Sequence, residues 1–258
     1  MRLVRIVEKG FSPVLFWECA VDKKELILQP RLALLASLVP QEASIADVGT
    51  DHGYLPVYLL QKGAVAHTIA SDINALPLEH AKRTAAEYGV TQGIDFRLCA
   101  GLDAISTQEV DTVIIAGMGG ETIIEILKNA SWTHEKTLLL QPMTKPELLR
   151  IWLTENGYAI TQEHLVRDKD TLYAVLTATG GESTPLTAAQ AYCGIESVHD
   201  PLYDDYASER ITKLTRAAAG LRGSKRQDRE ARIAELEAII KELKQSREAW
   251  QHGDCERN

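Results

Sequence analysis

The chain has 258 residues, a length that suits one α/β domain with a smaller appendage. Of these residues 45% are hydrophobic and 25% are charged, a composition that excludes a disordered or membrane-embedded protein. Its four cysteines lie far apart without any C-x-x-C pair, which argues against a zinc site and a disulfide scaffold, so we expect no metal and a cytoplasmic location. The formal net charge of −8 excludes a surface that is basic overall and, taken alone, argues against a nucleic-acid partner.

Residues 1–24 are interpreted as an N-terminal extension. Basic residues precede the apolar run Val14 to Trp17, as in a signal peptide, but acidic residues and a proline interrupt this pattern and the run is too short. From about Glu25 to Leu38, leucines recur at helical spacing, and Pro40 stops the pattern. We therefore expect an arm, no membrane segment, and a helix that leads into the first domain.

Short β-rich runs alternate with helical patterns over the next hundred or so residues, and this alternation indicates a parallel sheet. The run Val113 to Ala116 is apolar on both faces, as expected for a central strand that is covered by helices on each side. The expected strands are Ile45–Val48, His67–Ser71, Asp95–Leu98, Thr112–Ala116 and Thr137–Leu140, and the helical segments include Leu76–Tyr88, Glu121–Asn129 and Pro146–Asn156.

A closing hairpin is expected after these elements. Ala159 to Leu165 and Leu172 to Thr177 follow each other with only the polar turn Asp168 to Asp170 between them. Two strands joined so directly must include one that runs antiparallel to its neighbour, unlike the uniform crossovers of a plain dinucleotide-binding fold. The pattern predicts a mostly parallel seven-stranded sheet of the class I Rossmann-like methyltransferase type.

The last part of the chain is predicted to be a helical hairpin. Gly180-Gly181 and Pro185 mark a boundary, so we divide the chain into a methyltransferase domain, residues 25–180, and a C-terminal domain, residues 181–258. Two apolar seams with coiled-coil spacing flank a short polar turn, and residues 210–232 hold eight Lys/Arg against two acids, a local charge of +6. This hairpin is either a basic RNA-binding element or a packing and dimerisation element.

The segment from Asp47 to Gly53 follows a strand and precedes a helix, which is where a nucleotide-binding glycine turn belongs. Its spacing is G-x-x-x-G, and an acid, Asp47, ends the strand. Dinucleotide folds direct glycines and a helix N-terminus at a pyrophosphate, whereas S-adenosylmethionine has no phosphate and carries an ammonium. Asp47 and Gly49 therefore suit S-adenosylmethionine, and the alternative is an ordinary strand-turn-helix corner.

Further cofactor contacts are expected at the ends of the following strands. Asp72 can accept hydrogen bonds from both ribose hydroxyls, and Ile73 follows it. The segment Ala100 to Leu102 would face the adenine ring, and Ala116 to Gly120 would face the reacting methyl group, with glycines that let a substrate base approach closely. The cofactor-binding residues that we expect are Asp47, Gly49, His52, Gly53, Tyr54, Asp72, Ile73, Ala100, Gly101, Leu102, Ala116 and Gly117.

Together these segments carry a family resemblance. The motifs D-V-G-T-D-H-G-Y-L-P, S-D-I-N, I-I-A-G-M-G-G and L-Q-P-M occur in this order and at this spacing. They resemble the bacterial tRNA (adenine-N1)-methyltransferase family known as TrmK, which modifies adenine 22 in the D-arm. The resemblance covers approximately residues 28–177, and it implies S-adenosylmethionine as cofactor, tRNA as partner and a C-terminal coiled-coil domain that helps to hold the tRNA.

One departure concerns the end of the third strand. The family carries G-D-G-L there, whereas this chain has Cys99-Ala100-Gly101-Leu102. Ala100 cannot accept a hydrogen bond from the adenine amino group, so either a backbone group or water replaces that contact or the cofactor affinity is reduced.

Four residues are expected to be catalytic: Asp51, Gly117, Met118 and Arg31. Asp51 would stabilise the positively charged methylated base, or it would bind the cofactor's ammonium instead. Arg31 resembles an arginine that the family places near the catalytic pocket, the alternative being an ordinary surface arginine. His52 would contact substrate or fix the turn, and Tyr54 of that turn would stack on the base or pack in the core.

Substrate contacts are expected in two places. Gly119, Gly120, Gln141 and Pro142 would shape the acceptor pocket, and Arg222, Lys225, Arg226 and Arg229 would contact tRNA phosphates. The competing functions are methylation of a small molecule or a protein, and a non-catalytic RNA-binding protein. We expect a monomer, with a dimer through the C-terminal helices as the alternative.

Overall fold

The computed structural model describes residues 24–195, 199–223 and 228–253. The predicted arm at residues 1–24 lies outside these ranges except for Lys24. Within the described ranges, every helix is too short or too polar to traverse a lipid bilayer.

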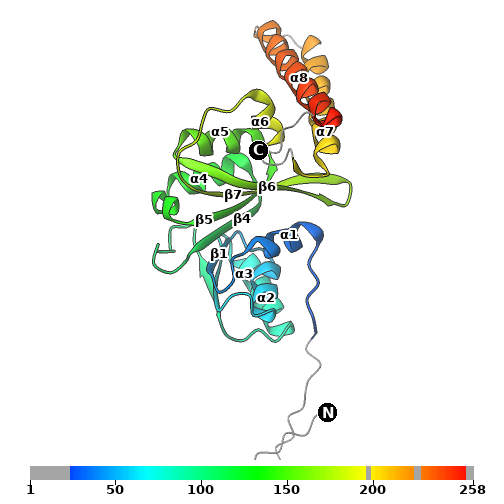
Figure 1. The fold of residues 1–258 in the computed structure, drawn as a ribbon. Coiled ribbons are helices and arrows are strands. Elements are labelled where there is room, and N and C mark those ends of the chain that lie inside the picture. Colours follow the sequence, from blue (N-terminus) through cyan, green and yellow to red (C-terminus); the bar gives the residue numbers. More distant parts are fainter. Residues whose placement is uncertain (1–23, 196–198, 224–227, 254–258) are drawn as a thin grey trace, which may run out of the picture.

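A seven-stranded sheet forms the centre of the molecule (Figure 1), and its strand order is β3-β2-β1-β4-β5-β7-β6. The first five strands in the chain pair in parallel, and β7 runs antiparallel to both β5 and β6. The predicted sheet and its closing hairpin are therefore confirmed. The strands are β1 (Ser44–Val48), β2 (His67–Asp72), β3 (Ile94–Leu98), β4 (Thr112–Gly119), β5 (Thr137–Thr144), β6 (Tyr158–Asp168) and β7 (Thr171–Gly180).

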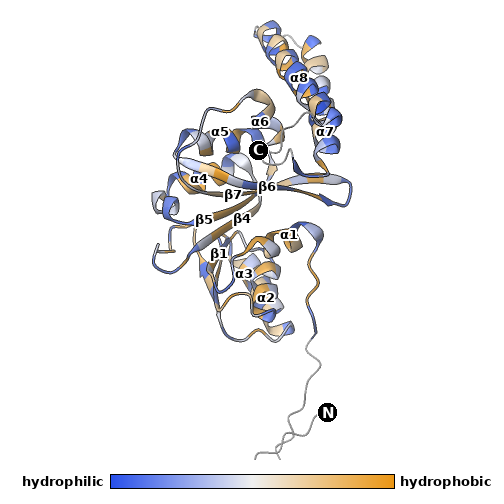
Figure 2. Cartoon of the chain, in the orientation of Figure 1, coloured by the Kyte–Doolittle hydropathy of each residue, from blue (hydrophilic) through white to orange (hydrophobic). Residues whose placement is uncertain are grey.

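Helices cover both faces of the sheet, as the apolar central strands require. On β4, Ile114 packs in the cluster under α1 and α2, whereas its neighbours Val113 and Ile115 pack in the cluster under α4 and α5. Figure 2 shows β4 and β5 coloured as hydrophobic strands between these layers. The helices of this domain are α1 (Pro30–Leu38), α2 (Tyr54–Gln61), α3 (Ala75–Glu87), α4 (Gly120–Lys128) and α5 (Pro146–Glu155).

The entry helix is shorter than predicted. We expected it to begin near Glu25, but α1 begins at Pro30 and the residues before it are not helical. Proline lacks an amide hydrogen and restricts the residue before it to extended conformations, so it suits the first helical position and ends any helix that precedes it. Leu28 is nevertheless half-buried in the extended segment and packs against the core, which explains why the leucine pattern continued upstream of Pro30.

The C-terminal helices pack on each other and on the sheet domain. The short helix α6 (Ala188–Cys193) begins with a capping box at Thr187, and α7 (Tyr203–Arg222) and α8 (Arg229–His252) lie side by side. Along α8 the hydropathy alternates between polar and apolar (Figure 2), and Leu236, Ile240 and Leu243 are buried. The predicted pairing of two C-terminal helices is therefore confirmed, while the coiled coil and the domain boundaries at 25–180 and 181–258 stay predictions.

A buried ion pair lies within the sheet domain, and its arginine also contacts the C-terminal part. Arg150 on α5 donates from Nε to Glu163 Oε1 on β6 at 2.6 Å and from Nη1 to the carbonyl oxygen of Ala191 on α6 at 2.9 Å. Both charged side chains are completely buried, and the buried Tyr206 of α7 belongs to the same core cluster as the sheet. Because a buried charge must be paired, Glu163 holds the guanidinium in place, and the hydrogen bond to Ala191 then ties α6 to the sheet domain.

Candidate active site

The turn after β1 is held by hydrogen bonds to the neighbouring strand. The amides of Gly49 and Thr50 both donate to the carbonyl oxygen of Ser71 on β2, at 2.8 and 2.9 Å. Thr50 Oγ1 donates to Asp47 Oδ2 at 2.6 Å, and the Asp47 side chain is buried at the end of β1. The turn therefore presents a fixed, buried carboxylate in the region where the sequence predicts the cofactor.

Two glycines of this turn have positive φ and lie close to other side chains. Gly49 has φ +74°, and a Cβ there would lie 2.1 Å from Cε of Met118. Gly53 has φ +67°, and its Cβ would lie 2.8 Å from Cβ of Ala81 on α3. A side chain at positive φ is strained, and at Gly53 it would also collide with the Cβ of Ala81, which is fixed to the backbone, whereas the flexible end of Met118 could move away from Gly49. The contact at Gly49 also brings Met118, from the end of β4, directly onto the predicted cofactor turn.

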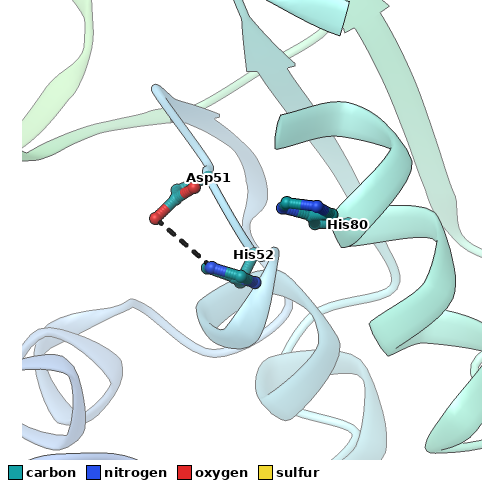
Figure 3. A group of neighbouring side chains, drawn as sticks. All are labelled: Asp51, His52 and His80. Atoms are coloured by element: carbon teal, nitrogen blue, oxygen red, sulfur yellow. Dashed lines mark ion pairs between the residues drawn. The ribbon is translucent and has the colours of Figure 1, made fainter. Parts of the chain in front are cut away.

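Asp51 and His52 lie on the exposed rim of the turn, and His80 of α3 joins them (Figure 3). Asp51 adopts a left-handed conformation with φ +49°, and its carboxylate lies 3.9 Å from Nε2 of His52. The His52 ring stacks on His80 at 5.0 Å and on Tyr54 at 5.3 Å between centroids. Sequence reasoning missed His80, because nothing in the local pattern of α3 distinguishes it.

The same three side chains, Asp51, His52 and His80, have ligand atoms within 4.8 Å of one another. A metal ion binds in the plane of an imidazole ring, along the nitrogen lone pair. The rings of His52 and His80 are stacked with only 11° between their planes, so their lone pairs do not converge. The arrangement is that of an aromatic stack, and coordination would require at least one ring to rotate.

Apolar side chains are exposed around the ends of β2 and β3. Ile73, Leu76 and Leu98 are exposed by 61–66%, beside Asp72, whose Oδ1 accepts a hydrogen bond of 2.8 Å from the amide of Asn74. Exposed large apolar groups next to a carboxylate fit a ligand with a planar apolar ring and hydroxyl groups. Ala100 is exposed here, Gly101 has φ +54°, and Leu102 is buried, so Leu102 can offer only its backbone.

The end of β4 is bulged and lies against β5. Gly117 has φ +78° and is exposed, and its amide donates to Gln141 Oε1 at 3.1 Å. Gly120 is buried, and a Cβ there would lie 2.5 Å from the carbonyl oxygen of Lys145. Gln141 and Pro142 are buried too, whereas Ala116 and Gly119 are partly exposed. The buried residues therefore support the backbone of this edge, and Gly117 and Gly119 form the surface that a ligand can reach.

The sheet brings nearly all of the predicted cofactor and catalytic residues to one edge. Asp47, Asp72, Gly101, Gly117 and Gln141 are at or next to the carboxyl ends of five adjacent parallel strands, and such an edge is the usual ligand site of an open α/β sheet. Arg31 reaches the same edge from α1, through Gln141. A shallow hollow of about 230 Å³ lies instead at the amino ends of β4 and β5, lined by residues that include Asp111 and Thr137.

The predicted tRNA contacts lie elsewhere. Arg222 ends α7 and Arg229 begins α8, at the end of the hairpin that points away from the sheet in Figure 1. Arg222 forms an exposed ion pair of 2.8 Å with Glu237. Lys225 and Arg226 lie outside the described residues. The sheet edge and the basic hairpin tip are therefore separate surfaces.

Burial raises the pKa of Asp47 to about 6, the hydrogen bond from Thr50 opposes this shift, and the charge of Asp72 adds to it. A positively charged group on a bound ligand, such as an ammonium, would favour the ionised form of the Asp47 carboxylate. In the folded protein the pKa of Asp47 exceeds the ordinary value of 3.8. Ionisation of Asp47 therefore destabilises the ligand-free protein as the pH rises from 3.8 to about 6. A bound ammonium would offset that destabilisation.

We therefore expect the affinity for S-adenosylmethionine to be constant above pH 6 and to fall below it, approaching about tenfold per pH unit. Asp47→Asn should bind more weakly at pH 7 and should lose this pH dependence. Calorimetric titration between pH 5 and 8 measures both effects. A variant that keeps the wild-type pH profile would assign the dependence to another group.

Comparison with known proteins agrees with this geometry. A family model described as a methyltransferase domain matches residues 28–176. The chain is 36% identical over 160 residues to the tRNA (adenine(22)-N(1))-methyltransferase of Bacillus subtilis, covering 61% of this chain and 67% of that one.

Two solved structures are similar over most of their length. The B. subtilis m1A22 tRNA methyltransferase TrmK superposes with a TM-score of 0.78 at 27% identity, covering 86% of this chain and 99% of that one. Streptococcus pneumoniae Sp1610, solved in complex with S-adenosyl-L-methionine, superposes with a TM-score of 0.72 at 30% identity, covering 83% and 97%.

Proposed function

The chain belongs to the TrmK family of tRNA (adenine(22)-N(1))-methyltransferases, and we propose that it transfers the methyl group of S-adenosylmethionine to N1 of adenine 22 in the tRNA D-arm. The observation that carries this proposal is the match to the B. subtilis enzyme over the domain that holds the strand-end edge described above. The edge supports this proposal, because it combines the buried carboxylate of Asp47, the carboxylate of Asp72 at a position suited to binding ribose hydroxyls, and exposed apolar side chains.

The residues of this edge suit S-adenosylmethionine. Asp47 is a buried acid without an ion-pair partner among the described residues, as a site for the ligand's ammonium should be. Asp72 has a second carboxylate oxygen for the ribose, and Ile73 and Leu98 would cover the adenine. When bound, the cofactor supplies a methyl group on a sulfonium that is a good leaving group.

The protein's part in the transfer is mainly placement. Adenine N1 has a lone pair at neutral pH, so the site needs alignment and tolerance of the cation that forms, and a dedicated base is unnecessary. Gly117 and Met118 form the floor on which the base would lie, next to the turn at Gly49. Asp51, exposed on the rim, is placed to stabilise the methylated base or the cofactor's ammonium.

The acceptor must leave its base pair to react. N1 lies on the pairing edge, so a paired adenine is shielded and the tRNA must present it opened or flipped. The exposed rim at Asp51, His52 and Tyr54 is the surface that such a base would meet first. We further propose a monomer, because the apolar seams of α7 and α8 face each other within one chain.

Transfer of labelled methyl groups tests the reaction class. The protein should label unmodified bulk tRNA and should leave protein and small-molecule fractions of the same extract unlabelled. Label confined to protein or to small molecules would contradict the proposal. Calorimetric binding of S-adenosylmethionine without any transfer would favour a non-catalytic RNA-binding protein.

Salt dependence tests the role of the hairpin tip. Each cation that contacts a phosphate contributes roughly 0.9 to the slope of log affinity against log salt, as measured for duplex DNA. Replacing Arg222, Lys225, Arg226 and Arg229 with alanine should therefore lower the slope for tRNA by about 3.6 and leave cofactor affinity unchanged. The measurement is a filter-binding titration between 50 and about 200 mM salt.

The matched control removes the same charge from the sheet domain, away from the hairpin, by alanine at Lys24, Lys62, Lys128 and Lys136. It should change the slope by less than one unit. An equal effect of the two variants would show that only net charge matters and would remove the hairpin tip from the tRNA site.

A further inference from the structure

Side chains from three strands and the backbone of a fourth converge on Arg31 at the edge of the sheet. Arg31 Nη1 donates to Gln141 Oε1 at 2.6 Å, and Nε lies 3.9 Å from Asp168 Oδ2. The guanidinium carbon lies 5.9 Å from the centroid of the Tyr173 ring. A Cβ at Gly117 would lie 3.6 Å from Nη1, so the cation rests against the backbone at the end of β4.

Gln141 is committed to the protein itself. Its side chain is completely buried, and Oε1 accepts from both Arg31 and the amide of Gly117. Its Nε2 donates to the carbonyl oxygen of Pro142 at 3.1 Å and lies 3.7 Å from the sulfur of Met143. With both ends of the amide occupied, Gln141 ties Arg31 to the bend at Gly117 and does not face a ligand.

Asp168 and Tyr173 add a second support from the β6–β7 hairpin. The Asp168 side chain is 11% exposed and the Arg31 side chain 19%, so the two charges attract each other more strongly than a surface pair would. The Tyr173 ring adds a cation–π contact. Arg31 is thus supported from β5, β6 and β7, three strands far from α1 in the sequence.

The Nη2 donors of Arg31 can still bind a ligand. Arginine has five N–H donors in a planar fork that matches carboxylate and phosphate oxygens. Within the described ranges, Nη2 of Arg31 makes no hydrogen bond to a protein group, although the side chain is mostly buried. A cation fixed on three sides with a remaining donor suits an oxyanion of a reactant.

We propose that Gln141, Asp168 and Tyr173 are positioning residues that hold Arg31 across the end of β4, where it binds an oxyanion of a reactant. That oxyanion is the carboxylate of the cofactor's methionine or a backbone phosphate of the nucleotide to be methylated. This assignment rests on the proposed function for the identity of the reactants. It also reassigns Gln141 from substrate contact to support.

Double-mutant cycles test the assignment. Asp168→Asn keeps the shape and removes the charge, Tyr173→Leu removes the ring, and Gln141→Leu removes both hydrogen bonds; each is made alone and together with Arg31→Met. Asp170→Asn, on the exposed turn of the same hairpin, is the matched control. For every variant kcat, both KM values, the calorimetric affinity for S-adenosylmethionine and the melting temperature are measured.

Arg31→Met should lower kcat/KM by about 10- to 100-fold, the equivalent of one charge-assisted hydrogen bond. In the Arg31→Met background the other substitutions should then have less than about a threefold further effect. Asp170→Asn should match the wild type. Loss confined to cofactor affinity identifies the carboxylate, and loss confined to the KM for tRNA identifies the phosphate.

Effects that simply add in the cycles would overturn the proposal, because independent contributions would mean that these residues do not act through Arg31. Gln141→Leu is the variant most prone to unfold, and the cycles with Asp168 and Tyr173 decide the matter if it does. If the wild type binds the cofactor but labels no tRNA, the proposed function fails, and cofactor affinity alone then decides whether Arg31 binds the carboxylate.

Discussion

Replacing Asp72 with alanine is expected to lower the affinity for S-adenosylmethionine by about 100-fold or more. Asp72 ends β2, and its Oδ1 accepts a hydrogen bond from the amide of Asn74, which leaves Oδ2 for the proposed contact to the ribose. A carboxylate that accepts hydrogen bonds from a ligand contributes roughly 1.5–3 kcal/mol per bond, and two bonds correspond to at least two orders of magnitude. Isothermal titration calorimetry measures the loss directly.

The matched control is Asp103→Ala, which removes an exposed carboxylate shortly after the end of β3. It should bind the cofactor as the wild type does. Because Asn74 also loses its partner in Asp72→Ala, the melting temperature of each variant must be compared without ligand. A change in affinity of less than about threefold in a folded Asp72→Ala protein would contradict the placement of the cofactor at this edge.

Replacing Arg150 with methionine is expected to destabilise the fold by about 3–5 kcal/mol, because it leaves the Glu163 carboxylate buried without its partner. For a chain of this size the melting temperature should fall by roughly 6–20 °C. The substitution also removes the hydrogen bond to the carbonyl oxygen of Ala191, which holds α6 against α5. Differential scanning calorimetry measures the change.

Two further variants separate charge pairing from packing. Arg150→Met combined with Glu163→Leu removes both charges and should recover most of the stability, since well-packed apolar residues replace buried ion pairs at little cost. Arg167→Met breaks an exposed pair with Asp205 and should cost less than about 1 kcal/mol. A single Arg150→Met variant as stable as Arg167→Met would show that the buried pair does not stabilise the fold more than an exposed pair does.

The sheet could be predicted because its signals are local. The apolar run at Val113 to Ala116 and the direct succession of the last two strands are properties of short segments, and the structure confirms both. The glycine turn at Asp47 to Gly53 was identifiable in the same way, because positive φ favours glycine at Gly49 and Gly53, and close packing excludes a side chain at Gly53. The start of α1 was wrong by about five residues, since the leucine spacing continues into the extended segment, where Leu28 packs against the core.

The parts of the site that the sequence did not predict all depend on distant contacts. The stack of His80 on His52 joins α3 to the turn after β1, and the hold of Asp168 on Arg31 joins β6 to α1. The burial of Gln141 likewise follows from strands packed on both sides of β5. Residue type and local spacing do not show which residues from distant parts of the chain come into contact.

The central claim is that adenine 22 of tRNA is the acceptor, and mapping the modified base tests it most directly. An unmodified tRNA transcript that has adenine at position 22 is incubated with the protein and labelled S-adenosylmethionine, beside the same transcript with guanine at that position. We expect label in the first transcript alone, with a reverse-transcription stop at position 22, because a methyl group on N1 blocks base pairing. Equal labelling of both transcripts, or a stop at another adenine, would contradict the assignment.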